Sequence, residues 1–302
     1  MTTSKTTGAR APQSIGLVAA LSKPEAQELA PEITRFLEDH GVTVIPERGL
    51  APDATAQVEA IIVLGGDGLM MRAAQSYADV PLLGINFGKV GFLANVERDD
   101  WRPALDAVLS GNFLIQESST LDARLETSHG TEPKGWAIND VVIRSGVRMI
   151  DIEVYVDGYY VNTYPGDGMI VATSRGSTAY CMAAGGPILT TGVRGFAIVP
   201  ISCHSPIRTP LVVDESAEID LLFTSRHDAS LILDGKVTSE LAPDDVVSVR
   251  RGEHVCRLIS VSNTDFYEAF RTKFNFRIRP DAAATGLPPS RNADPVREEE
   301  TR

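Results

Sequence analysis

Short apolar runs alternate with amphipathic segments over the first third of the chain, which indicates strands separated by helices. The apolar runs predict strands over residues 15–20, 42–45, part of 57–64, and 80–85. Strands that alternate with helices form a parallel sheet with crossover helices. Ligands bind such a sheet beyond the carboxyl ends of its strands, so the end of the 57–64 segment is a place to look for chemistry.

The first helix is indicated by its boundary residues as well as by its spacing. Ser22 and Glu25 match a capping box, and a proline lies in the first turn, where its missing N–H costs little. Pro31 is expected to kink or divide the helix, and Gly41 to end it. The apolar face consists of Leu29, Ile33, Phe36 and Leu37.

Beyond about residue 113 the pattern changes to the alternation that is typical of half-buried strands. Asp157-Gly158 separates two alternating runs, which predicts a β-hairpin, and Asp234-Gly235 supplies another turn. Further strand candidates are residues 169–172, 196–199, 219–223, 230–233 and 246–250. This part of the chain is predicted to be a layered, antiparallel β domain of the sandwich type.

Helical spacing returns near the C-terminus. Asp265 and Glu268 match a capping box, and the stripe that follows is best explained by core packing: Phe266, Phe270 and Phe274. From residue 280 onward the composition is typical of disorder. The predicted organisation is a disordered arm (1–14), an α/β domain (15–122), a β domain (123–262), a C-terminal helix (263–276) and a disordered tail (277–302).

One turn combines glycine with a carboxylate at the end of a predicted strand, Gly65-Gly66-Asp67-Gly68. Glycines let backbone N–H groups approach a ligand, and a helix N-terminus favours phosphate, so Gly65, Gly66 and Gly68 are candidate phosphate-binding residues. Asp67 would repel phosphate unless it holds a metal ion or takes a proton from an attacking hydroxyl, as in phosphoryl transfer. A plain turn with an Asp helix cap explains the same residues equally well.

A second glycine-rich segment lies at residues 165–187. Asp167-Gly168 leads into an apolar strand, and a helix of mostly small residues is expected to begin at Ser177 or Thr178 and to end at Gly185-Gly186. Small side chains would let a flat base approach the backbone, and the first N–H groups of the helix could bond its edge. A tightly packed structural helix explains this segment at least as well.

Composition excludes several classes of function. A formal net charge of −12 over 302 residues argues against nucleic acid or an anionic membrane as a partner, although a local pocket can still hold a nucleotide. No apolar run approaches the ~20 residues of a membrane span. The three cysteines lie far apart and are typical of reduced thiols, so we expect a cytoplasmic protein. Neither a Walker-type phosphate loop nor a G-x-G-x-x-G dinucleotide motif is present.

Taken together, the two glycine-rich segments resemble the NAD kinase family over about residues 60–275. Gly-Gly-Asp-Gly alone is shared with diacylglycerol and sphingosine kinases, so the resemblance depends on several motifs in one order. These motifs are Gly65-Gly66-Asp67-Gly68, Asn86-Phe87-Gly88 to Gly91-Phe92-Leu93, Asn139-Asp140, Asp167-Gly168, Gly176-Ser177-Thr178-Ala179-Tyr180, and Gly185-Gly186-Pro187.

The resemblance implies transfer of the γ-phosphoryl group of ATP to the adenosine 2′-hydroxyl of NAD, with a divalent ion, Mg²⁺, at the donor phosphates. It implies a Rossmann-like parallel α/β domain, a sandwich-like antiparallel β domain that binds NAD, and a last helix that returns to the first domain. It also implies a homodimer or homotetramer in which one subunit can contribute to its neighbour's site.

Residue roles follow from the same resemblance. Asp67 would activate the reacting hydroxyl with Gly68 beside it, and Phe92 would pack near the adenine. Asn139 would hydrogen-bond the adenosine, with Asp140 beside it where the family usually has Glu. Asp67 is the only candidate metal ligand that the sequence suggests. The remaining NAD contacts would be Asp167 at the nicotinamide end and Thr178, Ala179 and Tyr180 around the adenine.

Two other hypotheses use the same residues. A diacylglycerol-type lipid kinase would share the Gly-Gly-Asp-Gly turn, although the acidic composition and the lack of a basic amphipathic helix speak against it. A non-catalytic dinucleotide sensor would keep the fold and lose phosphoryl transfer. Its support is that Arg175, Ala183 and Arg208 depart from the family pattern.

Overall fold

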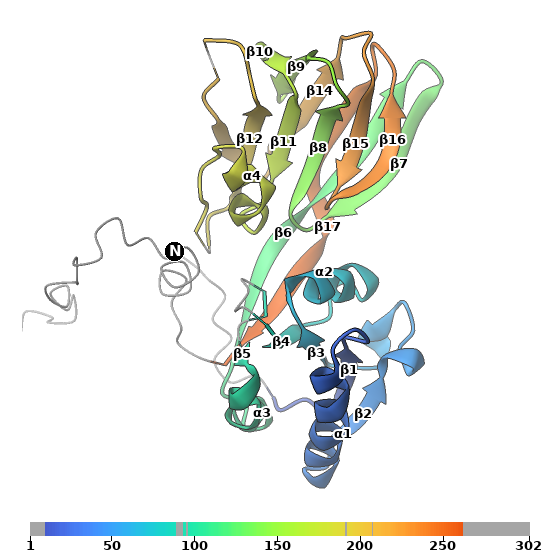
Figure 1. The fold of residues 1–302 in the computed structure, drawn as a ribbon, viewed down its shortest axis with the longest axis vertical. Coiled ribbons are helices and arrows are strands. Elements are labelled where there is room, and N and C mark those ends of the chain that lie inside the picture. Colours follow the sequence, from blue (N-terminus) through green and yellow to red (C-terminus); the bar gives the residue numbers. More distant parts are fainter. Residues whose placement is uncertain (1–9, 89–92, 95, 191, 207, 262–302) are drawn as a thin grey trace, which may run out of the picture.

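The computed structural model describes residues 10–88, 93–94, 96–190, 192–206 and 208–261. Figure 1 shows two domains, one with helices around a small sheet and one built mainly of strands, joined by two long strands. Within the described residues the strands form an eleven-stranded sheet and a six-stranded sheet. The predicted combination of an α/β domain with an antiparallel β domain is confirmed.

The N-terminal domain contains a parallel sheet in the order β4-β3-β1-β2. Its strands agree closely with the predicted ones: β1 (Ser14–Ala19), β2 (Thr43–Pro46), β3 (Ala60–Gly65) and β4 (Leu82–Asn86). A two-residue strand, β5 (Val96–Glu97), pairs with β4. In this register Gly65 lies beside Asn86, so the ends of β3 and β4 lie side by side.

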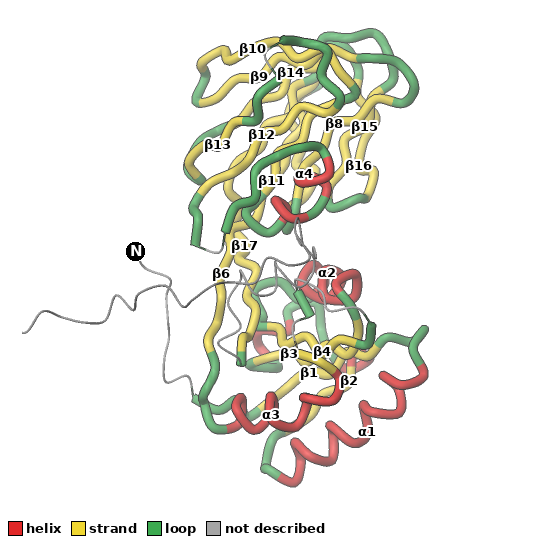
Figure 2. The backbone as a smooth tube through the Cα atoms, turned by 60° about the vertical axis from the view of Figure 1, so that its left-hand side comes forward, coloured by secondary structure: helices red, strands yellow, loops and turns green. Residues whose placement is uncertain are grey.

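Three helices cover the two faces of this sheet, as Figure 2 shows for α1, α2 and α3. They are α1 (Pro24–Asp39), α2 (Asp67–Ser76) and α3 (Trp101–Leu109), with 3₁₀ turns at Glu47–Gly49, Ala54–Ala56 and Arg98–Asp100. Apolar side chains of α1 and α3 pack on one face of the sheet, and those of α2 pack on the other. Burial of these apolar stripes holds the helices against the sheet.

The first helix differs from its prediction in two ways. Pro31 does not divide the helix, because burial of Leu29, Ile33 and Leu37 against the sheet outweighs one missing hydrogen bond, and a kink at Pro31 stays a prediction. Lys23, and not Ser22, is the N-cap residue, and no side chain caps the helix. Gly41 does follow the helix, with φ at +79°.

The C-terminal domain is a sandwich of antiparallel strands. One layer is the six-stranded sheet β13-β12-β11-β8-β15-β16, and the other belongs to the eleven-stranded sheet. The first layer contains β8 (Asp140–Ser145), β11 (Gly168–Ala172), β12 (Gly195–Ile201), β13 (Leu211–Asp214), β15 (Ala229–Leu233) and β16 (Lys236–Leu241). The second contains β7 (Gly130–Ala137), β9 (Ile150–Val156), β10 (Tyr159–Gly166) and β14 (Ile219–Phe223). Apolar residues of both layers form one core.

Two long strands, β6 (Leu114–Thr127) and β17 (Val246–Ser260), connect the domains and pair with each other along most of their length. In Figure 1 they cross the space between the two domains side by side. The sequence pattern predicted only the first part of β17 and missed β6 as a strand of this length. Each of these strands runs from one domain into the other, so its two halves pack against different neighbours. Neither strand therefore keeps a single alternation of apolar and polar residues along its length.

Some predictions concern residues outside the described ones. The C-terminal helix, the disordered tail and Phe92 all lie there, and the other domain boundaries remain predictions. None of the helices in the described part of the chain is both long and apolar enough to span a membrane. The described part of the chain contains Cys181, Cys203 and Cys256 as free thiols.

Candidate active site

Asp67 lies where the buried strand β3 passes into helix α2. Gly66 is the N-cap residue, and its carbonyl oxygen accepts the N–H groups of Leu69 and Met70, so Asp67 occupies the first helical position. The carboxylate is half-buried, and its Oδ1 accepts the backbone N–H groups of Leu93 and Ala94 at 3.1 Å each. These two donors orient the carboxylate at the carboxyl end of the parallel sheet, as the sequence predicts.

The three glycines of this turn serve different purposes. A Cβ atom on Gly65 would lie 2.6 Å from the side chain of Leu69, so this glycine makes room for packing. A Cβ atom on Gly68 would meet nothing within 4 Å, and one on Gly66 would meet only the Asn86 amide oxygen, at 3.9 Å. None of the three has a positive φ. Gly66 and Gly68 thus keep the start of α2 open to a ligand.

Asn139 is fixed to the second glycine-rich segment by backbone contacts. Its carbonyl oxygen accepts the N–H of Thr173 at 2.9 Å, and the Thr173 hydroxyl donates to the carbonyl oxygen of Ile138 at 2.7 Å. A Cβ atom on Gly176 would lie 2.0 Å from the Asn139 carbonyl oxygen, so glycine is required there. The structure therefore brings Asn139 beside Thr173 and Gly176, at the start of the segment that continues to Thr178 and Tyr180.

Asp234 holds the Asn139 turn from the other side, a role that the sequence pattern does not indicate. Its two carboxylate oxygens accept the backbone N–H groups of Ile138, Asn139 and Asp140 at 2.7, 2.7 and 3.1 Å. Asp234 has φ +47°, which directs its side chain back toward β8. From the sequence, the Asp-Gly pair predicts only a hairpin turn. The partners of the Asp234 carboxylate lie more than ninety residues away in the chain and come close only because β15 pairs with β8.

Asp140 lies in the interior next to Asp234, with 6% of its surface exposed. Burial, and then the negative charge of Asp234, raise the pKa of Asp140 to about 7. The carboxyl group of Asp140 therefore keeps its proton to a higher pH than an exposed aspartic acid does.

A hydrogen-bonded bridge connects the two sides of the site. The side-chain amide of Gln75, on the same helix as Asp67, donates to Asp234 Oδ2 at 2.9 Å. Its oxygen accepts from the Lys236 ammonium at 3.0 Å. Helix α2 and the short helix α4 (Tyr180–Ala183) accordingly lie across from each other between the two domains in both ribbon views.

The predicted adenine segment starts with a tight turn. A 3₁₀ turn spans Gly176–Thr178 and is followed by α4, so the single helix that was predicted from Ser177 or Thr178 is wrong. The break lies at Ala179, whose ψ of −124° interrupts the helix. The Tyr180 ring is half-buried and lies 5.7 Å from the Arg144 guanidinium, which leaves an aromatic face beside a cation at the site.

Asp167 lies at the opposite end of β11 from Thr173. The five-residue strand, ~16 Å long, separates these two residues. Asp167 is exposed, and its backbone pairs with Ile201 and Ser145. Its predicted contact with the nicotinamide end of a dinucleotide stays a prediction.

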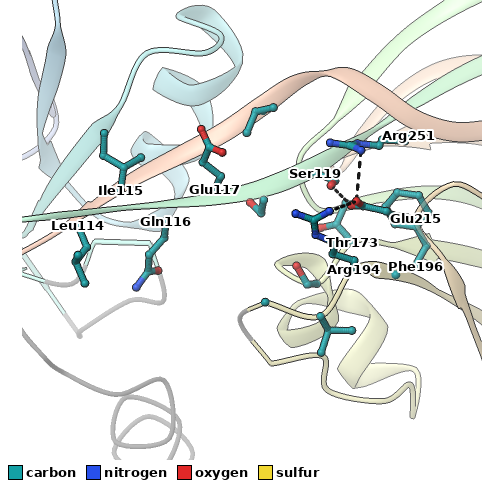
Figure 3. A pocket seen from close by; sticks show the side chains of 16 residues that line it. Leu114, Ile115, Gln116, Glu117, Ser119, Thr173, Arg194, Phe196, Glu215 and Arg251 are labelled. Carbon is teal, nitrogen blue, oxygen red and sulfur yellow. Dashed lines mark hydrogen bonds and ion pairs between the residues drawn. The ribbon is translucent and has the colours of Figure 1, made fainter. Parts of the chain in front are cut away.

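A separate cleft of about 270 Å³ runs along the connecting strands β6 and β17 (Figure 3). At its end the buried Glu215 accepts from the Ser119 hydroxyl and pairs with Arg251 at 3.3 Å and Arg194 at 3.9 Å. The cleft reaches the glycine-rich segment only at Thr173 and Ser174. It contains none of the predicted site residues, and its volume is small for a dinucleotide.

Metal-binding side chains are sparse in the part of the chain that the structure describes. No three His, Cys, Asp or Glu residues gather there in a group that could hold an ion. An ion at the glycine turn would therefore take most of its ligands from phosphate oxygens and water, which is typical of Mg²⁺ at nucleotides.

Comparisons with known proteins identify the family. Residues 47–113 match the family described as ATP-NAD kinase N-terminal domain, and residues 138–261 match the one described as ATP-NAD kinase C-terminal domain. The chain is 53% identical over 279 residues to the NAD kinase of Thermomicrobium roseum, covering 92% of this chain and 96% of the relative. It is 36% identical to the NAD kinase of Moorella thermoacetica, covering 86% and 89%.

Solved structures agree with the fold. Yeast NADH kinase in complex with NADH superposes with a TM-score of 0.80 at 18% identity, covering 91% of this chain and 90% of that chain. An NAD kinase from Archaeoglobus fulgidus in complex with ATP gives 0.69 at 23% identity, covering 87% and 97%. With both halves of the chain matched and a relative of more than 50% identity over nearly its whole length, this chain belongs to the NAD kinase family.

Proposed function

We propose that this chain transfers the γ-phosphoryl group of ATP to the 2′-hydroxyl of the adenosine ribose of NAD, giving NADP. The observation that carries the proposal is the bridge from helix α2 through Gln75 to Asp234 and the Asn139 turn. It holds a carboxylate at the start of a helix across from a segment suited to adenosine. The relative that matches nearly the whole chain is named NAD kinase, and this name does not favour the lipid-kinase hypothesis.

Asp67 is the proposed proton acceptor. A ribose hydroxyl is a poor nucleophile because it holds its proton tightly, and a positioned carboxylate can take that proton as the phosphorus–oxygen bond forms. Backbone N–H groups of Leu93 and Ala94 hold one carboxylate oxygen in place, so the side chain need not reorganise during the reaction. Help of this kind is typically worth ~10²–10⁴-fold in rate.

The acceptor side positions the adenosine. Asn139 would bond the adenosine part of NAD, and Thr178, Ala179 and Tyr180 would surround the adenine. The support is that Asp234 and Gly176 fix this backbone from two sides. Asp167, which is exposed, would hold the nicotinamide end, and in a homodimer or homotetramer a neighbouring subunit would contribute to this site.

The donor side positions ATP. Gly66 and Gly68 leave the first N–H groups of α2 accessible, and these would bind phosphate oxygens. A bound divalent ion, expected to be Mg²⁺, would neutralise the negative charge that develops on the transferred phosphoryl group. Asp67 is one candidate ligand for it.

We expect the enzyme to act in the cytoplasm, where reduced thiols are the rule.

An assay of NADP formation tests the proposal. Purified full-length protein is incubated with Mg²⁺ and with NAD or NADH, against ATP, another nucleoside triphosphate or polyphosphate as donor. We expect ATP- and Mg²⁺-dependent production of NADP from NAD. Tight NAD binding without NADP from any donor would support the sensor hypothesis, and phosphorylation of diacylglycerol but not of NAD would support a lipid kinase.

A further inference from the structure

Asn86, the last residue of β4, carries a side-chain acceptor that has no partner among the described residues. The residue is 4% exposed, and its Oδ1 is buried with no hydrogen-bond partner in the described part of the chain. Its Nδ2 donates to the carbonyl oxygen of Gly88 at 3.2 Å, which fixes which end of the amide is the oxygen. Buried acceptors are nearly always paired, so this atom calls for an explanation.

The unpaired oxygen points into the glycine turn. It lies 3.9 Å from the position of a Cβ atom on Gly66 and 4.0 Å from that of one on Gly88. Gly66 is the N-cap of α2, a helix of ten residues, so the oxygen stands beside the end of the helix that attracts anions. An acceptor placed there would repel phosphate oxygens and attract a cation or a bound water.

A cation reaches the same place from the end of β1. The ammonium group of Lys23, the N-cap residue of α1, donates to the carbonyl oxygen of Phe87. It lies 3.3 Å from the position of a Cβ atom on Gly88. An ammonium group has three N–H donors, so one contact to a carbonyl leaves donors for phosphate oxygens. In a chain of net charge −12, an anion needs a local cation of this kind.

We propose that Asn86 and Lys23 complete the phosphate-donor subsite of this enzyme. Asn86 Oδ1 binds the divalent ion that accompanies the donor, directly or through one of its waters, and Lys23 binds the phosphate oxygens. The inference rests on the proposed function, because it places the donor triphosphate at the ends of β1, β3 and β4. A single ligand, the metal-bound triphosphate, would account for three observations: the unpaired amide oxygen, the open space at Gly66 and the position of the Lys23 ammonium group.

Binding of the non-hydrolysable ATP analogue AMP-PNP tests the role of Asn86 without turnover. Its affinity is measured by calorimetry on the full chain, with and without Mg²⁺, for wild type, Asn86→Ala and Asn86→Asp. Both variants lose the Nδ2 donor, but only Asn86→Asp keeps an oxygen. We expect Asn86→Ala to reduce the Mg²⁺-dependent gain in affinity by roughly tenfold or more and Asn86→Asp to keep it. The matched control is Asn112→Ala, at an exposed asparagine of the same domain.

Lys23→Met tests the cation in the same assay. It keeps the length of the side chain and removes the charge, and we expect AMP-PNP to bind roughly tenfold more weakly both with and without Mg²⁺. The control is Arg102→Met, which removes one positive charge from an exposed residue paired with Glu32 in the same domain. Melting temperatures of all variants identify those that fail to fold.

The outcomes separate this inference from the proposed function. If Asn86→Ala keeps the wild-type Mg²⁺ dependence, or if Asn86→Asp loses it to the same extent, the amide only shapes the turn and the inference is wrong. If Lys23→Met binds AMP-PNP as Arg102→Met does, the cation has no part in the subsite. If wild type makes no NADP and binds no AMP-PNP under any condition, the proposed function itself is wrong.

Discussion

The two sides of the site use glycine differently. On the donor side, a Cβ atom on Gly66 would meet only an amide oxygen, and one on Gly68 would meet nothing within 4 Å. On the acceptor side, a Cβ atom on Gly176 would lie 2.0 Å from a carbonyl oxygen. Glycine therefore leaves room for a ligand on the donor side and allows close backbone packing on the acceptor side. The carboxylates differ in parallel: Asp67 is half-buried at a helix start, while Asp140 is enclosed beside Asp234. One side is built to admit a ligand, and the other to hold a fixed shape for it.

The largest expected effect separates chemistry from binding. Asp67→Asn keeps a side chain that can still accept the N–H groups of Leu93 and Ala94 but removes the proton acceptor. We expect kcat to fall by ~10²–10⁴-fold while the affinity for NAD, measured by calorimetry, stays close to wild type. Asp99→Asn, at an exposed residue of the same domain, is the control. If the Asp67→Asn enzyme keeps the wild-type kcat, Asp67 is not the proton acceptor.

The two uses of glycine make opposite predictions for alanine. Gly176→Ala forces a methyl group onto the Asn139 carbonyl, and we expect it to lower the free energy of unfolding by about 3 kcal/mol. Gly68→Ala lies inside α2 with open space around it, and we expect it to raise the free energy of unfolding by up to ~1 kcal/mol while kcat/KM for ATP falls. Urea unfolding and steady-state kinetics on both variants give the answer. Equal destabilisation by the two substitutions would contradict the comparison.

Much of the donor side could be predicted from the sequence, because its elements are local. An apolar strand, a glycine turn and a helix follow one another over residues 60–76, and Asp67 lies where this pattern puts it. In the sequence, Asn86 stands out only as part of a motif. Its importance comes from a parallel register that sets it beside Gly65, and register cannot be derived from one strand alone.

The acceptor side was less predictable because its contacts join distant segments. In the sequence, Asp234 indicates only a hairpin turn, and nothing distinguishes Gln75 from other polar helix residues. Their roles arise where β15, β8 and α2 meet, at separations of ninety residues and more. The helix predicted from Ser177 was wrong for a similar reason, since the segment follows the backbone of Asn139 and not its own helical propensity.

The enclosed side should respond to pH. The pKa of Asp140 is about 7 in the folded chain, against an ordinary value of 3.8. At pH values between these two, Asp140 is therefore protonated in the folded state and ionised in the unfolded state. Its contribution to stability is complete below about pH 4 and is lost as the pH rises through 7, with a slope of at most about 1.4 kcal/mol per pH unit. Asp140→Asn should therefore be more stable than wild type at pH 8 and show a smaller gain at pH 5, in urea unfolding. An equal difference at both pH values would contradict the burial argument.

The smallest expected effect concerns the bridge between the sides. Gln75→Met keeps the length of the side chain but removes its hydrogen bonds with Asp234 and Lys236. We expect the free energy of unfolding to fall by about 1 kcal/mol, because the bridge is only partly buried. Since the bridge sets the position of α2 relative to the Asn139 turn, kcat should fall while KM for NAD changes little. Ser76→Ala, the exposed neighbour on the same helix, is the control, and a Gln75→Met enzyme with the same kcat and stability as Ser76→Ala would show that the two sides are positioned by β6 and β17 alone.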